Sequence, residues 1–254
     1  MMKLKDWVTL GNLASGTASI VALMNDRFDL ACYLIFLGFF FDMFDGIVAR
    51  ITKQFDKFGA ELDGLCDLIT YSVAPGFIVY YAFYKEAGIH VIPSAILGFV
   101  FIAVGVVRAA RYNVRKLEFP GFFIGLPRPA AALMIISVLN SALFTQLGPK
   151  LNKYLFSIPA VMIVMISVLM LMTTPFIGHH DRKFSGWLRF GKDVFLVSVP
   201  ASLVAGWLIG YPYLLFDVTL FSMIVYVVLG NLKVPKEELV AVREFIVEWK
   251  KKTD

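Results

Sequence analysis

The chain has 254 residues, of which 59% are hydrophobic and only 17% are charged. Soluble globular domains are about half apolar and about a quarter charged, so this composition indicates a protein that lies in a lipid bilayer. The net charge of +5 is less informative than its placement along the chain. Both cysteines fall inside apolar segments, which argues against a disulfide framework.

Apolar segments follow one another along the whole chain, each near the length of about 20 residues that a membrane-spanning helix requires. We therefore predict an all-α, polytopic bundle of about eight transmembrane helices, forming one membrane domain of residues 1–232. The predicted spans are residues 7–24, 30–49, 65–84, 91–107, 127–146, 154–175, 194–210 and 213–230.

A different kind of helix is expected after the last span, in residues 233–254. Pro235 precedes a stretch in which apolar residues recur at helical spacing, namely Leu239, Val240, Phe245, Ile246 and Trp249. Charged residues occupy the other face. We expect this C-terminal amphipathic helix to lie on the cytoplasmic membrane interface as an anchor or packing element.

Basic residues are distributed unevenly across the predicted topology. With an even number of spans, both termini lie on one side of the membrane, and that side holds 20 of the 24 Lys and Arg residues. The other side holds Arg27, Lys85, Lys150 and Lys153. The positive-inside rule places the rich side in the cytoplasm, so we predict a multi-pass protein of the cell membrane with both termini cytoplasmic.

Four aspartates converge at one cytoplasmic boundary. Asp42 and Asp45 are three residues apart and share one face of the second predicted helix. Gly59, Asp63 and Asp67 recur every four residues and share one face of the next helix. The connection is short, so the two helices are expected to be antiparallel neighbours whose polar faces meet. Ionisable residues in apolar segments usually mark function.

Such a cluster of carboxylates predicts bound cations. Carboxylates in a low-dielectric pocket repel one another, and some would have to protonate unless cations neutralise them. Hard divalent cations with oxygen ligands are the natural partners, and two of them would balance four negative charges. Two such ions also suit a substrate that carries a pyrophosphate. Gly46 and Ala49 leave the helix backbone open to a flat ligand, and we expect Arg50 to reach a phosphate.

These residues resemble the signature of the CDP-alcohol phosphatidyltransferases. The pattern Asp42-x2-Asp45-Gly46-x2-Ala49-Arg50-x8-Gly59-x3-Asp63-x3-Asp67 matches that signature at every position. The resemblance implies a metal-dependent reaction in which an alcohol displaces CMP from a CDP-linked lipid, in a helical core that is often a homodimer. It assigns the metal ions, Mg or Mn with Ca as an alternative occupant, to Asp42, Asp45 and Asp63. Asp67 would be the general base and could also touch metal.

The resemblance extends over roughly residues 9–135 and is strongest to the phosphatidylserine synthase branch. The stretches that carry it are Thr9-Leu10-Gly11-Asn12, Phe58-Gly59-x-Glu61-Leu62-Asp63, Ala74-Pro75, Arg111-Tyr112-Asn113 and Gly125-Leu126-Pro127-Arg128-Pro129-Ala130-Ala131-Ala132. The sequence departs from the branch at Gly64, which is usually Ser, and at Thr70-Tyr71-Ser72, which is usually Ser-Phe-Gly. By resemblance the CDP-lipid pocket is lined by Asn12, Asp45, Gly46, Ala49, Arg50 and Gly59.

The acceptor predicted by this branch is L-serine. Its carboxylate requires a cation, and arginine is suited to bidentate capture of a carboxylate. The candidates for serine binding are Arg111, Asn113 and Arg128. The predicted reaction transfers a phosphatidyl or archaetidyl group from CDP-diacylglycerol or CDP-archaeol to the serine hydroxyl and releases CMP.

Other functions remain open from the sequence. The same chemistry could use glycerol phosphate or inositol phosphate, whose phosphate the basic segment 108–128 could bind, although the stretch 125–132 favours serine. A cation transporter would be expected to place its ion site near the membrane midplane, whereas these aspartates lie at a boundary. A catalytically dead scaffold is disfavoured because every signature position is present. No nucleic-acid-binding module is apparent.

Overall fold

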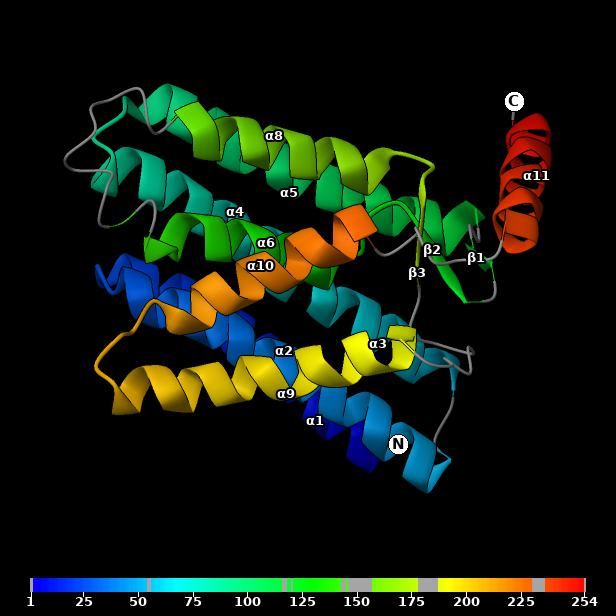
Figure 1. Ribbon diagram of the computed structural model, residues 1–254, viewed down its shortest axis with the longest axis horizontal. Coiled ribbons are helices and arrows are strands. Elements are labelled where there is room, and N and C mark those ends of the chain that lie inside the picture. The colour runs from blue at the N-terminus through cyan, green and yellow to red at the C-terminus, as the bar shows by residue number, and fades with distance from the viewer. Residues whose placement is uncertain are drawn as a thin grey trace.

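The computed structural model describes residues 2–53, 56–115, 118–119, 121–142, 145, 157–177, 187–229 and 236–253. Within them the chain forms a bundle of helices that lie roughly side by side (Figure 1). The helices are α1 (Leu4–Met24), α2 (Phe28–Thr52), α3 (Lys57–Leu68), α4 (Ala74–Tyr81), α5 (Val91–Arg115), α6 (Arg128–Asn140), α8 (Ser157–Leu171), α9 (Trp187–Leu208), α10 (Leu214–Leu229) and α11 (Lys236–Thr253).

Four stretches of helix are long and apolar enough to cross a membrane, namely Leu4–Met24, Phe28–Thr52, Lys57–Glu86 and Val91–Asn113. Four shorter apolar helices fall within the four remaining predicted spans, at Arg128–Asn140, Ser157–Leu171, Val197–Leu208 and Leu214–Val228. Large apolar side chains such as Trp7, Phe99 and Trp207 are exposed on the outside of the bundle, as expected for a surface that contacts lipid. The prediction of an all-α multi-pass membrane protein is confirmed.

The third long span contains two π-helical turns, η1 (Ile69–Val73) and η2 (Ala82–Glu86), which join α3, α4 and the end of the span without a break. Pro75 follows directly after the first residue of α4. Proline has no backbone N–H to donate to the preceding turn. The hydrogen bond missing at Pro75 is therefore a local cause of the wider, π-helical turn at η1. Thr70 in η1 donates its hydroxyl to the carbonyl of Asn12 at 3.0 Å, which ties this turn to α1.

Small residues bring α1, α2 and η1 into close contact. A Cβ atom on Gly16 or on Gly38 would overlap the side chain of Thr70. Closely approaching backbones at small residues are a common way of packing helices in membranes, where water provides no hydrophobic drive between them. This contact fixes the first three spans relative to one another, and these spans carry the four aspartates.

A three-stranded antiparallel sheet, which the sequence analysis did not predict, lies beside the bundle. Its strands are β1 (Glu118–Phe119), β2 (Phe122–Ile124) and β3 (Pro175–Ile177), in the order β1-β2-β3. The sheet joins the segment after α5 to the segment after α8. Strands of two or three residues are too short to produce a readable alternation of apolar and polar residues, so hydropathy carries no signal for them.

The predicted amphipathic helix is present as α11 and packs on this sheet. Val242 and Ile246 of α11 are buried against Phe122 and Ile124 of β2. Leu239, Phe245 and Trp249 pack around the same cluster. Figure 1 shows α11 at the same end of the bundle as the start of α1. Part of its apolar face is therefore covered by the protein itself, in agreement with the predicted packing role.

Candidate active site

Three of the four predicted aspartates meet between α2 and α3. One carboxylate oxygen from each of Asp42, Asp63 and Asp67 lies within 4.8 Å of the other two. The helical spacing inferred from the sequence is the reason: Asp63 and Asp67 are one turn apart on α3, and they face Asp42 on the antiparallel α2. The predicted meeting of the two polar faces is confirmed for these three residues.

Asp67 is held by polar groups on both of its carboxylate oxygens. The side-chain amide of Asn12 on α1 donates a hydrogen bond to Oδ1 at 3.0 Å. The guanidinium of Arg128, at the start of α6, lies 3.5 Å from Oδ2, and its other terminal nitrogen donates to the carbonyl oxygen of Gly64 at 3.3 Å. Only 13% of the Asp67 side chain is exposed. This carboxylate therefore has a fixed orientation and a cation beside it.

Asp42 accepts a hydrogen bond from a tyrosine that the sequence analysis did not select. The hydroxyl of Tyr71 donates to Oδ2 of Asp42 at 3.1 Å, and the Tyr71 side chain is fully buried. Tyr71 follows Asp67 by four residues, so it extends the face of Asp63 and Asp67 by one turn. The four-residue spacing from Asp67 could have identified Tyr71 from the sequence. It was overlooked because Tyr71 lies in a stretch where the sequence differs from the phosphatidylserine synthase branch.

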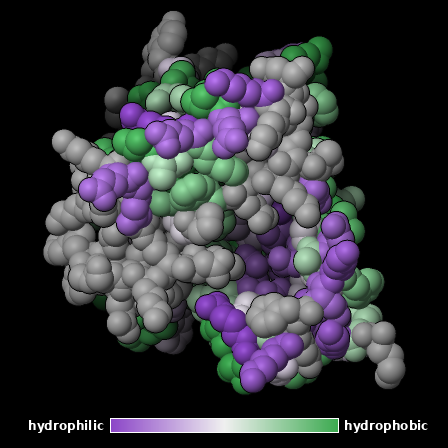
Figure 2. Space-filling view, turned by 90° about the vertical axis from the view of Figure 1, so that its right-hand side faces the viewer, coloured by the Kyte–Doolittle hydropathy of each residue, from purple (hydrophilic) through white to green (hydrophobic). Residues whose placement is uncertain are grey.

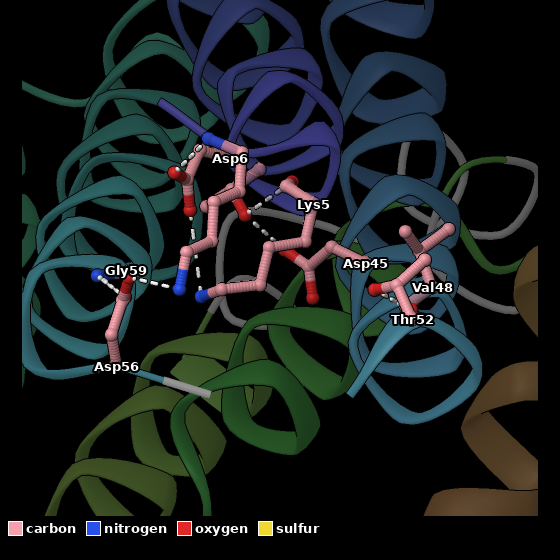
Figure 3. Close-up of polar contacts among 9 residues, drawn as sticks. Lys5, Asp6, Asp45, Val48, Thr52, Asp56 and Gly59 are labelled. Carbon is pink, nitrogen blue, oxygen red and sulfur yellow. Dashed lines mark hydrogen bonds and ion pairs between the residues drawn. The ribbon is translucent and has the colours of Figure 1, made fainter. Parts of the chain in front are cut away.

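Asp45 lies one turn from Asp42 on α2 and is oriented differently. Its Oδ2 atom accepts a hydrogen bond from the hydroxyl of Thr9 on α1 at 2.7 Å, and both residues are buried. Figure 3 shows Asp45 on α2 close to the side chain of Lys5 on α1. Asp45 is not part of the three-carboxylate cluster among the described residues. Its assignment to a metal ion stays a prediction.

The donor set of Asp42, Asp63 and Asp67 fits a divalent cation. Mg²⁺ and Ca²⁺ bind carboxylate oxygens at about 2.0 to 2.6 Å, so two ligands of one ion are at most about 4 to 5 Å apart. The separation of the three oxygens lies within that limit. Three carboxylates close together in an apolar bundle also repel one another unless positive charge neutralises them.

The residues predicted to contact a CDP-lipid lie on α1, α2 and α3, next to the aspartates. Ala49 is buried, Gly46 is half-buried, and Arg50 is exposed and donates its Nε–H to the carbonyl of Gly46 at 2.9 Å. Figure 2 shows that the end of the molecule carrying the start of α1 is hollowed and that the atoms visible inside the hollow are hydrophilic. The side-chain amide of Asn12 contacts Asp67 directly, so this residue joins the predicted CDP-lipid surface to the carboxylate cluster.

The three candidates for serine binding have different surroundings in the structure, and their assignment stays a prediction. Arg128 contacts Asp67, as described above. Arg111 donates to the carbonyl of Leu171 at 2.6 Å and lies over the ring of Trp249 on α11, 5.8 Å from its centre. Asn113 is exposed near the end of α5. Arg128 is thereby placed beside the carboxylate cluster.

A buried arginine near the site has a structural function that the sequence analysis did not recognise. Arg108 on α5 donates hydrogen bonds to the carbonyls of Ile124, Gly125 and Met170 at 2.9–3.2 Å, and only 5% of the residue is exposed. Gly125 has a φ of +75°, a conformation that favours glycine. Arg108 thus holds the turn that leads into α6 and presents Arg128 to Asp67.

The fold and the cluster define a class of membrane transferases, and sequence comparison agrees. Residues 2–176 match the model of the CDP-alcohol phosphatidyltransferase family. This match covers more than half of the chain, and the chain belongs to that family. The resemblance inferred from the signature residues is confirmed.

Similar proteins carry names that refer to serine. A CDP-diacylglycerol–serine O-phosphatidyltransferase of Methanocaldococcus jannaschii is 30% identical over 233 residues, which cover 92% of this chain and 94% of that protein. A Helicobacter pylori protein of the same name is 37% identical over 130 residues, which cover 50% of this chain and 53% of that protein. An archaetidylserine synthase of Methanothermobacter thermautotrophicus is 34% identical over 166 residues, covering 65% of this chain and 67% of that protein.

Proposed function

We propose that this protein transfers the phosphatidyl or archaetidyl group of a CDP-linked lipid to the hydroxyl of L-serine and releases CMP, a step of phospholipid biosynthesis. The observation that carries the proposal is the meeting of Asp42, Asp63 and Asp67, with an arginine on the last of them. Relatives that align with most of the chain are named for this reaction. The lipid substrate would be CDP-diacylglycerol or CDP-archaeol.

In the proposed mechanism Asp67 is the general base. Its carboxylate accepts the proton of the serine hydroxyl, and the serine oxygen then attacks the phosphorus next to the lipid. The bond from that phosphorus to the CMP oxygen breaks, and CMP leaves with the electron pair. Asn12 and Arg128 keep the two oxygens of Asp67 in place. Preorganised groups of this kind lower the barrier because little reorientation is needed during the reaction.

Asp42, Asp63 and Asp67 are the residues that would hold divalent ions, with Asp45 as the further predicted ligand. Two bound Mg or Mn ions would neutralise the diphosphate and make CMP a better leaving group. The Tyr71 hydroxyl bonded to Asp42 restricts how that carboxylate can turn. Thr9 does the same for Asp45.

The substrate pockets follow from the same placement. We assign the CDP moiety to the surface formed by Gly46, Ala49, Arg50 and Gly59, with Asn12 and Asp45 at its edge. The serine carboxylate is assigned to Arg128, because it is the candidate that already lies beside the base. Arg111 and Asn113 remain predictions for the same pocket.

The arrangement in the membrane is part of the proposal. The basic residues favour a cell-membrane protein with both termini and the active site on the cytoplasmic side. We further propose that residues 1–232 form the membrane domain, that residues 233–254 form a cytoplasmic amphipathic helix, and that the protein is a homodimer, as the family resemblance implies.

The reaction is tested by measuring CMP release from the purified protein with a CDP-linked lipid and Mg²⁺ or Mn²⁺. The acceptors to compare are L-serine, glycerol phosphate and inositol phosphate. Release that depends on serine alone supports the proposal. Release only with one of the phosphorylated alcohols would keep the chemistry and overturn the acceptor. No release with any of them would favour an ion site, because a cation transporter does not produce CMP.

A further inference from the structure

A buried lysine lies next to the aspartates and has no function in the mechanism given above. Lys5 is in the first turn of α1, and only 8% of the residue is exposed. Lysine is almost never buried to this degree unless its charge is paired. Among the described residues its ammonium has one carboxylate within ion-pair distance, Oδ1 of Asp6 at 3.5 Å. Strong contacts of this type are about 2.7 to 2.9 Å long, so the pairing is loose.

The ammonium group of Lys5 occupies space that Gly59 leaves open. A Cβ atom on Gly59 would overlap the Nζ atom of Lys5, so any larger residue at position 59 would displace the ammonium. In Figure 3 the Lys5 side chain passes Asp45 of α2 and extends toward Gly59 of α3. The missing side chain at position 59 therefore places a cation where α1, α2 and α3 meet.

The carboxylates around Lys5 are already engaged by other groups. Asp56 lies 2.6 Å from the Lys3 ammonium and accepts the backbone N–H of Gly59 at 2.8 Å. The contact with Lys3 holds the pKa of Asp56 below its usual range. Asp6 accepts the backbone N–H of Lys3 at 2.7 Å through its other oxygen. Asp45 accepts the hydroxyl of Thr9. The Lys5 ammonium can therefore take a new anionic partner without leaving any of these carboxylates without a donor.

The backbone of Lys5 is linked through Thr9 to Asp45. The Thr9 hydroxyl that contacts Asp45 also lies 3.1 Å from the carbonyl oxygen of Lys5, one turn earlier on α1. Lys5 is thus held on the same face of α1 as Thr9 and Asn12, which contact Asp45 and Asp67. A ligand that reaches this face of α1 would therefore meet Lys5 together with side chains that contact the aspartates.

We propose that Lys5 binds the diphosphate of the CDP-linked substrate by charge. This inference rests on the proposed function, because that function supplies the CDP-linked lipid as the substrate. Lysine is a common phosphate-binding residue and acts as a point charge. Its ammonium would exchange the long contact with Asp6 for phosphate oxygens, while Gly59 keeps the space open. Lys5 is thereby a binding residue for phosphate and contributes nothing to recognition of the cytidine base.

The test compares CDP with cytidine, which lacks the phosphates, by calorimetric titration of the purified protein in detergent with Mg²⁺. Lys5→Met is expected to weaken CDP binding by about 10- to 100-fold, the usual effect of losing a hydrogen bond to a charged group. Cytidine binding should stay within about twofold, since no phosphate is involved. Lys3→Met is the matched control, because it removes a cation from the same helix end that contacts only Asp56 among the described residues. It should leave both affinities unchanged.

Equal losses for CDP and cytidine in Lys5→Met, or no loss for CDP, would overturn the inference while the proposed function stands. A wild-type protein that binds neither CDP nor cytidine would instead overturn the proposed function. If Lys5→Met does not elute as a folded protein, Lys5→Gln replaces it, with the same expected selective loss for CDP. Lys5→Arg retains the charge and should keep CDP affinity closer to wild type than either neutral variant does.

Discussion

Asp67 has each carboxylate oxygen held by a different helix, Oδ1 by Asn12 of α1 and Oδ2 by Arg128 of α6. These two contacts fix the orientation of the carboxylate, as a general base requires if it is to accept a proton from a bound hydroxyl. Asp67→Asn keeps the shape of the side chain but cannot accept that proton as a carboxylate does. We expect the rate of CMP release at saturating substrate to fall by about 100- to 10,000-fold, the usual contribution of general base catalysis.

The control for this substitution is Asp217→Asn. Asp217 accepts hydrogen bonds from Tyr211 and from the backbone of Ala142, near the turn between α9 and α10. It lies on α10, whereas the carboxylate cluster lies on α2 and α3. Its variant should keep activity within a few-fold. An Asp67→Asn protein that retained comparable activity would rule out Asp67 as the base.

The two arginines predicted to bind serine have different surroundings, and this difference makes a prediction. Arg128 lies beside the base, whereas Arg111 contacts Leu171 and Trp249. Arg128→Met should raise KM for serine by about 10- to 100-fold, because it removes a charge-assisted contact to the serine carboxylate. Arg111→Met should change KM for serine much less. The measurement is the serine dependence of CMP release, and a larger effect from Arg111 would exchange their assignments.

The sequence predicted the aspartates well and their partners poorly. The i, i+4 spacing places Asp63 and Asp67 on one face without any knowledge of the fold. The contacts of Thr9 with Asp45 and of Tyr71 with Asp42 join residues 36 and 29 positions apart. Hydroxyl groups on buried helix faces are common, and only the packing of three helices shows which of them meet a carboxylate.

At the scale of elements, the turn between β2 and α6 determines where Arg128 lies, and Arg108 holds that turn. Arg108→Met would leave up to three buried carbonyl groups without their donor. We expect a loss of about 2–5 kcal/mol in the free energy of unfolding, as is usual when a buried polar network is broken. The thermal unfolding of the detergent-solubilised variant measures this loss.

Arg108→Lys separates charge from geometry. A lysine keeps the charge but cannot reach three carbonyls with a rigid planar group, so it should recover only part of the stability. In both variants KM for serine should rise as well, because Arg128 is no longer held against Asp67. Wild-type stability in Arg108→Met would show that Arg108 does not hold this turn.

Hydropathy located the helices but not all of their limits. It predicted a span at residues 65–84, whereas the helical stretch runs over Lys57–Glu86. The difference arises because the first turns of α3 carry Glu61 and Asp63, which lower the hydropathy without breaking the helix. The sheet of β1, β2 and β3 was missed for a different reason: strands of two or three residues have no period.

At the scale of the whole molecule, the two ends of the third long span are marked by different lysines. Lys3 pairs with Asp56, directly before α3, and Lys85 lies in η2 at the other end of the same stretch. If this stretch crosses the bilayer, these two positions lie on opposite sides. The excess of basic residues on the side of Lys3 predicts that this side lies in the cytoplasm.

Cysteine labelling tests this orientation. A membrane-impermeant thiol reagent applied to intact cells should label Lys85→Cys and should label Lys3→Cys only after the membrane is opened. The native Cys32 and Cys66 are buried and should contribute little background. The reverse pattern would invert the topology, and labelling of both positions from outside would contradict a membrane crossing between them.

In the proposed reaction the serine hydroxyl oxygen attacks the phosphorus next to the lipid, and the bond from that phosphorus to CMP breaks. The most direct test supplies L-serine carrying ¹⁸O in its hydroxyl group, together with a CDP-linked lipid and Mg²⁺, and determines by mass spectrometry where the label goes. This reaction yields a serine-containing phospholipid that retains the ¹⁸O, together with unlabelled CMP. Label in CMP, or CMP formed without a labelled serine lipid, would contradict it.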